Sequence, residues 1–323
     1  MGKSATAVKD EDYVQHLLIA STHDTILLFT NTGKVYWLKV YMIPVAGRQA
    51  RGRPVINLLP SLEEGEQITS ILPVKSYDED KFIFMATANG TVKKTALTQF
   101  ARQRSVGLRA IELDEGDTLV GTAITNGSCD VVLFASSGKA ARFRESQVRA
   151  MGRTSRGVRG IRLGEGQRVI GMVIPMENGQ VLTVSENGYG KRTEVGEFPA
   201  KGRGSQGVIG MQTTERNGQL VGAVQVFDGE EIMLISDQGT MVRTRVDEVS
   251  VLSRNTQGVR LIKLKDGERM QGLERIEESA DETAKRELAR AEAAEGEEAL
   301  EDGVIDDAAD DQVGDAADDA TDE

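Results

Sequence analysis

Apolar and polar residues along this chain alternate in short segments, or form apolar runs of four to six residues bounded by glycine, asparagine and aspartate. This pattern is typical of β-strands joined by tight turns and not of amphipathic helices. We expect a hairpin at each of five similar segments, in which a polar residue precedes the turn glycine. The segments are ILLFTNTGKVYWLKV (26–40), FMATANGTVKKTAL (84–97), LFASSGKAARFRES (133–146), LTVSENGYGKRTEV (182–195) and LISDQGTMVRTRV (234–246).

Three series of glycines repeat in phase with these segments. The first series marks the hairpin turns, the second follows 17 to 19 residues later, and the third marks an acidic turn. The series are Gly33, Gly90, Gly138, Gly188 and Gly239; Gly52, Gly107, Gly157, Gly207 and Gly258; and Gly65, Gly116, Gly166, Gly218 and Gly267. Phased repetition of this kind identifies five copies of one unit of about 50 residues.

A unit of four short strands cannot bury both of its faces alone, so it must stack on its neighbours. We therefore expect an all-β domain over residues 1–276, built blade by blade as a propeller or a close relative. A solenoid is the competing geometry. Residues 1–20 align with the back half of a repeat, with Gly2 in the place of Gly258, which predicts an incomplete first blade.

Charge is unevenly distributed, and this changes the picture given by the net charge of −12. Residues 271–323 hold 21 acidic and 4 basic residues, which leaves 35 basic against 30 acidic residues in the body. Low-complexity acidic sequence has little to bury, so residues 277–323 are predicted to be a largely disordered tail. Two roles are open for this tail: solubility, or competition with a polyanion for the basic body.

Basic residues recur at fixed positions in the repeats. They occupy the strand after each turn glycine, three, four and six residues on, and the loop that follows that strand. The candidate DNA-binding residues are Arg48, Arg51, Arg53, Lys93, Lys94, Arg102, Arg104, Arg142, Arg144, Arg153, Arg156, Lys191, Arg192, Lys201, Arg203, Arg243, Arg245 and Arg254. Trp37 is the exception to the basic residues found four positions after the turn glycine.

A positive charge at the same register of each blade predicts a basic belt along one edge of the assembly. Lysine on a strand edge also protects against aggregation, but that role does not require one sign at one register. A one-sided stripe rich in arginine favours contact with phosphate, so we expect duplex DNA to be bent around the belt with little base readout. A propeller that binds an acidic protein through the same belt is the alternative from another class.

Composition excludes several other classes of protein. The single Cys129 excludes an internal disulfide and fits a reducing cytoplasm, and no apolar run is long enough for a membrane span. His16 and His23 are the only histidines, so no multi-histidine metal site is expected. The glycine pattern of residues 202–207 is followed by a strand-like segment, which argues against a dinucleotide site.

Several segments together closely resemble the C-terminal domain of the A subunit of bacterial DNA gyrase. They are ARGRPVINLLP, MATANGTVKKT, VRAMGRTSRGVRGIRL, NGYGKRT and RNTQGV. The resemblance implies a six-bladed β-pinwheel whose outer rim wraps DNA, in an ATP- and magnesium-dependent type IIA topoisomerase assembled from two A and two B subunits. The related domain of topoisomerase IV is the alternative within this family.

Two departures from the family pattern limit what the chain is expected to do. The family's Q-R-R-G-G-K-G box has only Gly2 to represent it, and the region with the catalytic tyrosine is absent from this sequence. We therefore expect a chain that binds DNA, holds no cofactor or metal of its own, contacts no membrane and cleaves nothing. Its partners would be duplex DNA, the N-terminal region of the A subunit, and the B subunit.

Overall fold

The computed structural model describes residues 18, 20–46 and 52–276, and in this part of the chain it contains strands and short 3₁₀ turns but no α-helix. The prediction of an all-β, propeller-like domain is confirmed. Each of the five expected segments forms a hairpin. The hairpins are β1 (Thr25–Thr30) with β2 (Lys34–Lys39), β4 (Phe82–Thr87) with β5 (Thr91–Ala96), β8 (Asp130–Ala135) with β9 (Lys139–Arg144), β12 (Gln180–Ser185) with β13 (Tyr189–Glu194), and β16 (Glu231–Ser236) with β17 (Met241–Arg245).

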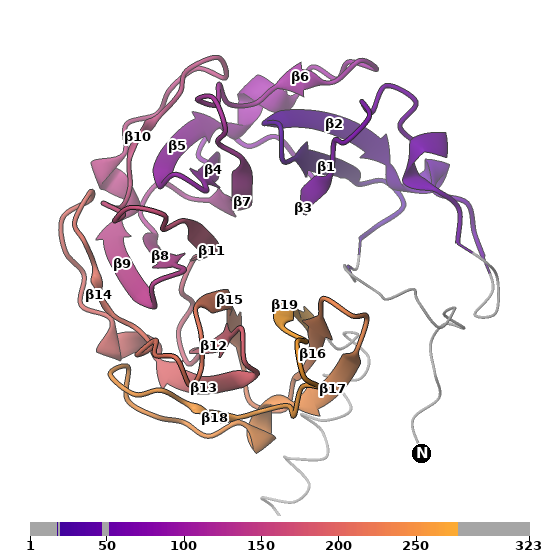
Figure 1. Ribbon diagram of the computed structural model, residues 1–323. Coiled ribbons are helices and arrows are strands. Elements are labelled where there is room, and N and C mark those ends of the chain that lie inside the picture. Colours follow the sequence, from indigo (N-terminus) through magenta and orange to yellow (C-terminus); the bar gives the residue numbers. More distant parts are fainter. Residues whose placement is uncertain (1–17, 19, 47–51, 277–323) are drawn as a thin grey trace, which may run out of the picture. The chain divides into compact units, whose positions relative to one another are not determined.

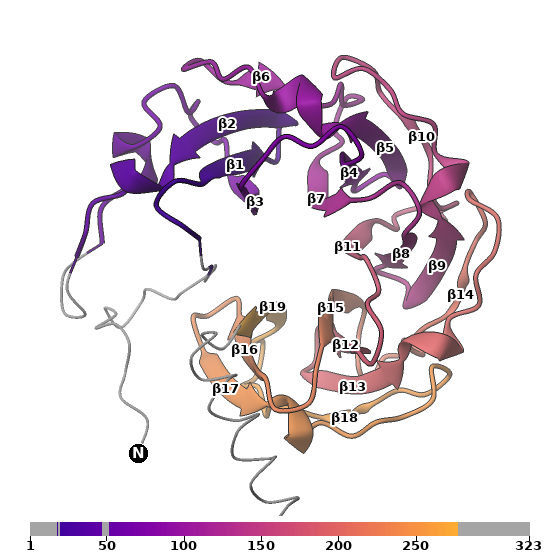
Figure 2. The same cartoon turned by 180° about the vertical axis from the view of Figure 1, so that it is seen from behind.

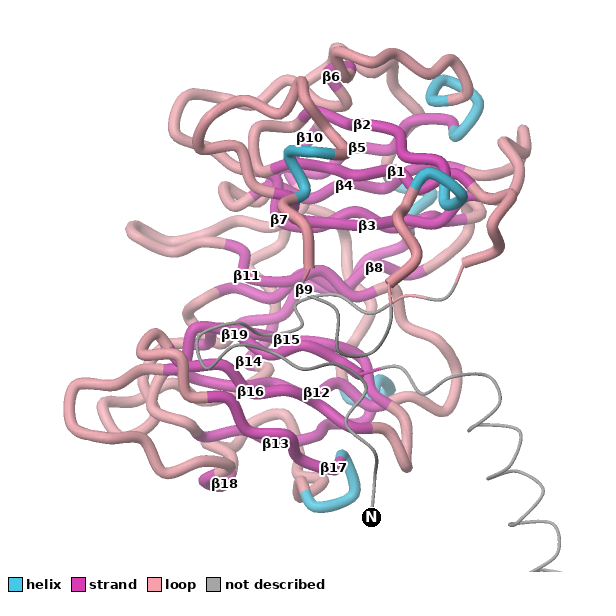
Figure 3. The backbone as a smooth tube through the Cα atoms, turned by 90° about the vertical axis from the view of Figure 1, so that its right-hand side faces the viewer, coloured by secondary structure: helices cyan, strands magenta, loops and turns pink. Residues whose placement is uncertain are grey.

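Each hairpin is joined on one side by a long strand from its own repeat, and these strands line the inside of the arc (Figure 1). They are β3 (Ile68–Val74), β7 (Leu119–Thr125), β11 (Val169–Val173), β15 (Leu220–Val226) and β19 (Met270–Ile276). Figure 3 is turned by 90° from Figure 1, and in it the strands run across the page. In Figure 1 they therefore run roughly along the line of sight. The five sheets thus stand side by side as blades, and the described residues contain five of them.

The other side of a blade carries a two-residue strand that comes from the next repeat. These strands are β6 (Leu108–Arg109), β10 (Val158–Arg159), β14 (Val208–Ile209) and β18 (Val259–Arg260), which pair with β2, β5, β9 and β13 respectively. A sequence repeat is therefore not a blade, which corrects the expectation that all four strands of a repeat form one unit. The exchange covers an edge strand that would otherwise expose unpaired backbone groups.

The fifth blade differs from the others because it has three strands, in the order β17-β16-β19. No strand among the described residues pairs with the outer side of β17. Seen from behind, the outermost strands end with β18 on the fourth blade (Figure 2).

Glycines allow the exchanged segments to lie close to the hairpins. Gly138 turns the β8–β9 hairpin with φ +78°, and a Cβ atom there would lie 2.1 Å from the carbonyl oxygen of Met211 in the next repeat. Gly207, just before β14, also has a positive φ, and a Cβ atom there would lie 2.5 Å from the carbonyl oxygen of Ala140. At both places a side chain would separate two repeats.

The hydrophobic core lies between blades. All six residues of β8 are buried, as expected for a strand with a neighbouring blade on each face. At the end of the 3₁₀ turn after the second and after the fourth hairpin, a buried aromatic residue packs against the preceding blade. Phe100 in η3 (Leu97–Phe100) packs edge-on against Phe29 with ring centroids 6.0 Å apart, and Phe198 packs likewise against Phe134 at 5.6 Å.

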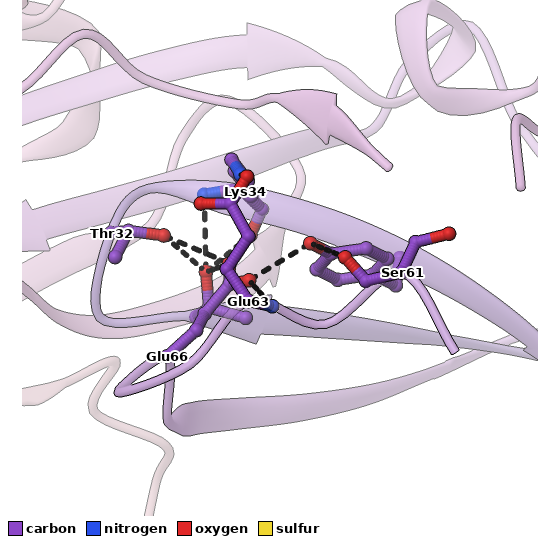
Figure 4. A network of polar contacts seen from close by, with 7 residues as sticks. Thr32, Lys34, Ser61, Glu63 and Glu66 are labelled. Carbon is purple, nitrogen blue, oxygen red and sulfur yellow. Dashed lines mark hydrogen bonds and ion pairs between the residues drawn. The ribbon is translucent and has the colours of Figure 1, made fainter. Parts of the chain in front are cut away.

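The carboxylates of the acidic turns bind the chain that surrounds them. In the first blade Glu66 accepts hydrogen bonds from Thr30 at 2.6 Å, Thr32 at 2.8 Å, Tyr36 at 2.9 Å and the Glu63 N–H at 3.0 Å (Figure 4). Burial acts to raise the pKa of Glu66, but these hydrogen bonds outweigh it and lower the pKa below its ordinary value. The acidic turn thus ties the hairpin to the inner strand.

Two predictions concern residues outside the described part of the chain. The incomplete first blade is expected at residues 1–20, of which the structure describes Leu18 and Ala20, and Leu18 packs against the cluster around Ile26 and Leu28. The acidic tail, residues 277–323, lies outside the described residues altogether.

Candidate nucleic-acid interface on the outer strands

The outermost strands and the loops that lead to them form the candidate interface. We call this surface the outer rim and define it as strands β6, β10, β14 and β18 with the preceding loops, residues 101–107, 149–157, 199–207 and 250–258. Both face views place these strands on the outside of the arc (Figures 1 and 2). Each of these loops belongs to one repeat, and the outer strand that follows the loop pairs with the hairpin of the preceding repeat. The outer rim therefore runs continuously from blade to blade.

Most of the predicted residues that the structure describes have exposed or partly exposed side chains. Arg48 and Arg51 lie outside the described residues. Those with exposed side chains are Arg53, Arg102, Arg104, Arg144, Arg156, Lys201, Arg243 and Arg245, and those partly exposed are Arg142, Arg153, Arg203 and Arg254.

Lys93 and Lys191 must be corrected, because both are completely buried. Lys93 Nζ donates hydrogen bonds to the carbonyl oxygens of Ala110, at 2.8 Å, and Arg153. Lys191 Nζ donates to the carbonyl oxygens of Ser253 and Arg254, both at 2.6 Å. Burial lowers the pKa of Lys93 to about 7 and that of Lys191 to about 8. Neither ammonium group can reach phosphate.

The register four residues after the turn glycine is also corrected. Lys94 and Arg192 are buried, and Arg142 is largely so. Arg142 Nη1 donates to the Val195 carbonyl at 3.0 Å, and Arg192 Nε donates to the Val249 carbonyl at 2.7 Å. These acceptors lie in or beside the 3₁₀ turn of the next repeat, so the register fastens one blade to the next.

Trp37, the exception in the sequence, performs the same task. Its Nε1–H donates to the carbonyl of Phe100, at the end of η3, at 2.9 Å. The requirement at this register is a long side chain with an N–H donor, and tryptophan meets it without a charge. Lys94 also interacts with Glu145, where Nζ lies 3.8 Å from Oε1.

The last described blade differs at this register, because no described strand pairs with the outer side of β17. Arg243 is exposed over 60% of its side chain and pairs with Glu231 on the same hairpin. Arg245 is similarly exposed and lies 3.2 Å from Asp247. Both remain candidates for phosphate contact, since exposed ion pairs are weak and exchange readily.

Loop arginines are partly engaged by the backbone of the preceding repeat. Arg203 Nη1 donates to the Arg159 carbonyl at 2.5 Å, and Arg254 Nη1 donates to the Ile209 carbonyl at 2.9 Å. A guanidinium carries five N–H donors in a plane, so these contacts orient the group and leave donors for a phosphate. Arg156 is instead held by Asp114 at 2.9 Å, which reduces its charge at the surface.

Four arginines of the outer rim are missing from the set predicted from the sequence: Arg149 in a loop, which is exposed, and one on each of three outer strands. Arg109, Arg159 and Arg260 are exposed and occupy the second position of β6, β10 and β18. The sequence does contain a signal for them, because each lies two residues after a glycine of the second series. The signal cannot be interpreted as long as β6, β10 and β18 are expected to pair within their own repeats. Only the exchange between repeats places these strands, and their arginines, on the outside.

The resulting surface offers a row of guanidinium groups and glycine-rich backbone, which suits a polyanion. Within the described residues no cluster of histidine, cysteine, aspartate or glutamate could hold a metal ion. The same residues also form no helix long and apolar enough to span a membrane.

Comparison with known proteins identifies relatives of this arrangement. A family model described as the DNA gyrase C-terminal domain, beta-propeller, matches residues 24–75, 81–126, 130–175, 179–226 and 230–277. The A subunit of DNA gyrase from Salmonella typhimurium is 53% identical over 280 residues, which are 87% of this chain and 32% of the relative. Its counterpart from Buchnera aphidicola is 58% identical over 275 residues, covering 85% and 33%. The chain thus spans about a third of the length of the curated relatives it matches.

Two solved structures share the fold. The C-terminal domain of DNA topoisomerase IV has a TM-score of 0.76 at 26% identity, covering 84% of this chain and 85% of the other. The DNA gyrase A C-terminal domain has a TM-score of 0.68 at 27% identity, covering 80% and 84%.

Proposed function

Because the chain belongs to the DNA gyrase C-terminal domain family, we propose that it binds duplex DNA along the outer rim and bends the duplex around its blades. The observation that carries this proposal is the row of exposed and partly exposed arginines in all four loops of the outer rim and on three of its four strands. Phosphate contacts of this kind position a duplex without reading its bases, so the curvature of the rim selects bent or flexible DNA.

The proposed contacts follow from exposure. We assign direct phosphate contact to the exposed and partly exposed members of the predicted set and to the outer-strand arginines. Arg142 is excepted, because its guanidinium is held by the next repeat. The residues that support the loops from below are Lys93, Lys94, Arg142, Lys191 and Arg192.

A sixth blade completes the proposed domain. The outer side of β17 lacks a strand among the described residues, and Arg243 pairs with Glu231 instead of the 3₁₀-turn carbonyl that its counterparts bind. In the alignment of residues 1–20 with a repeat, Lys3 and Ser4 take the places of Val259 and Arg260 in β18. We propose that residues 1–20, which align with the back half of a repeat, belong to this sixth blade.

The domain is proposed to act within a larger enzyme. The relatives that are A subunits of DNA gyrase are about three times as long, so the parts for cleavage and ATP use belong to other segments and other subunits. The partners proposed are the N-terminal region of the A subunit and the B subunit, in an assembly of two copies of each, acting with ATP and magnesium on the bacterial chromosome in the cytoplasm. The role of this chain in that assembly is to wrap the DNA segment that the enzyme uses for negative supercoiling.

A salt titration tests the proposal. Affinity for a linear duplex of about 40 base pairs is measured by fluorescence anisotropy between low and moderate salt. Neutralisation of about ten phosphates predicts a slope of log K against log salt near −9. A slope shallower than about −3, or equal affinity for an acidic polypeptide of the same charge, would reject a DNA-binding rim and favour a protein partner.

A further inference from the structure

A basic pocket that shares Arg260 with the outer rim lies at the hairpin-turn end of the fourth blade. It is a cavity of about 400 Å³. Its walls come from the β12–β13 turn, the turn before β15, and the segment from β18 to β19. The charged residues that line it are Arg216, Arg260, Lys263, Lys265 and Arg269, with Asp266 and Glu268.

Tyr189 forms the floor of this pocket and holds two arginines in place. It is 4% exposed, and its hydroxyl accepts hydrogen bonds from Arg260 Nη2 at 2.9 Å and Arg216 Nε at 3.4 Å. The two guanidinium carbons lie 4.9 Å and 5.4 Å from the ring centroid, for Arg216 and Arg260 respectively. These hydrogen bonds lower the pKa of the Tyr189 phenol below its ordinary value. Each guanidinium uses one N–H on the phenol and keeps others for a ligand.

The first blade has the opposite chemistry at the same register. Lys34 corresponds to Tyr189, because each lies one residue after the hairpin glycine of its repeat. Glu63 corresponds to Arg216, because each lies two residues before the glycine of the acidic turn. Lys34 Nζ lies 2.5 Å from Glu63, so the charge is neutralised within the blade (Figure 4). In the fourth blade an arginine replaces the glutamate, and two guanidinium groups contact one aromatic ring.

The acidic residues of the pocket compensate only part of its charge. Glu268 is buried and accepts hydrogen bonds from Ser236 at 2.5 Å and from the Lys265 N–H at 2.9 Å, so it faces the fold. Arg269 interacts with Asn187 at 3.2 Å and lies 3.9 Å from Glu186. The basic residues that line the pocket outnumber the acidic ones, which leaves an excess of positive charge in a concave site.

We infer that this pocket binds a phosphate group, with Arg216 and Arg260 as the paired guanidinium ligands and Tyr189 as the residue that positions them. Two arginines held at fixed orientation suit the tetrahedral, multiply charged oxyanion better than a single carboxylate. The phosphate comes either from a small phosphorylated compound or from a duplex. The second source rests on the proposed function, because it requires DNA to reach the turn end of the blade.

Two titrations of the full chain test this inference. Inorganic pyrophosphate is titrated by calorimetry, and the duplex by anisotropy, against the natural chain and Arg216→Glu. The substitution introduces the residue type that the first blade has at this position, and a thermal melt of the variant checks that it folds. Arg162→Glu is the matched control, because it makes the same charge change at the position between β10 and β11 that corresponds to Lys263. Tyr189→Phe removes the hydroxyl and keeps the ring.

We expect Arg216→Glu to weaken pyrophosphate binding at least tenfold, Tyr189→Phe to weaken it about threefold, and Arg162→Glu to leave it within twofold. A selective loss with pyrophosphate alone identifies a small phosphorylated ligand, whereas a selective loss that includes the duplex identifies a DNA phosphate. Equal effects of Arg216→Glu and Arg162→Glu on both probes would overturn the inference. Failure of the natural chain to bind duplex would reject the proposed function and leave the pyrophosphate result standing.

Discussion

The buried ammonium group of Lys191 donates a hydrogen bond to the carbonyl oxygen of Arg254 at 2.6 Å, which fixes an arginine of the outer rim from beneath. Lys93 makes the same contact with the carbonyl of Arg153 in an earlier repeat. The basic residues of this domain thus fall into two groups: some have side chains exposed to solvent, and others tie the outward-facing loops to the preceding blade.

Replacing Lys191 by methionine should lower the free energy of unfolding by about 1–3 kcal/mol. The side chain keeps its apolar length, but the carbonyls of Ser253 and Arg254 lose their donor. Urea denaturation measures the change. The control is Lys201→Met, an exposed lysine that should cost at most about 0.5 kcal/mol. Equal losses for the two variants would contradict the buried role.

Replacing Trp37 by phenylalanine should destabilise the domain by about 1–3 kcal/mol, because the carbonyl of the buried Phe100 loses its donor and the smaller ring leaves space. The matched variant is Arg243→Ala, at the same register of the last blade, where the side chain is exposed and pairs with a carboxylate. That variant should remain within about 0.5 kcal/mol of the natural chain. Thermal unfolding at matched salt measures both.

Arg192→Ala and Arg144→Ala should have separate effects. Arg192 is buried against the Val249 carbonyl, so its loss should destabilise the fold by about 2–4 kcal/mol and change the DNA affinity of the folded protein little. Arg144 is exposed over 63% of its side chain, so its loss should weaken all duplex sequences alike, reduce the salt slope by about 1, and leave stability unchanged. A loss of preference at one base position would show base readout instead.

Acid should loosen the acidic turns. Hydrogen bonds, chiefly from Ser236, lower the pKa of Glu268 from its ordinary 4.5 to about 2. The Glu268 carboxylate takes up a proton near pH 4.5 in the unfolded chain and near pH 2 in the folded chain. The stability that the ionised carboxylate contributes is therefore complete above pH 4.5 and is lost as the pH falls toward 2. Glu268→Gln should therefore flatten the pH dependence of stability between about pH 5 and pH 2. An unchanged profile would show that the carboxylate is not bound in the folded state.

Deleting residues 277–323 should tighten duplex binding at low salt and change it little at high salt. These residues hold most of the acidic excess of the chain, and a tethered polyanion competes for the same arginines as phosphate. Anisotropy at two salt concentrations measures the effect. The melting temperature of the body provides the control and should not move. Unchanged affinity at low salt would leave only a role in solubility.

The hairpins, their turn glycines and the basic character of the outer loops can be predicted because they are local features of the sequence. The outward placement of Arg144 and Arg156 follows from polarity alone. The burial of Lys93 and Arg192 cannot be predicted in this way, because it depends on carbonyls about 60 residues further along the chain. Trp37 is the one residue in the sequence that indicates this burial. Tryptophan, lysine and arginine share an N–H donor but not a charge, so the position four residues after the turn glycine requires a donor and not a charge.

The exchange of outer strands has a consequence for synthesis. A chain that leaves the ribosome from its N-terminus cannot finish the blade of β1 and β2 until the following repeat has emerged, because β6 belongs to that repeat. In each such blade the outer edge of the hairpin therefore stays unpaired until about 35 residues beyond its inner strand have been synthesised. The strand that pairs with this edge lies in the repeat that emerges next. Assembly proceeds in overlapping steps, in which every new repeat completes its predecessor before it is itself complete.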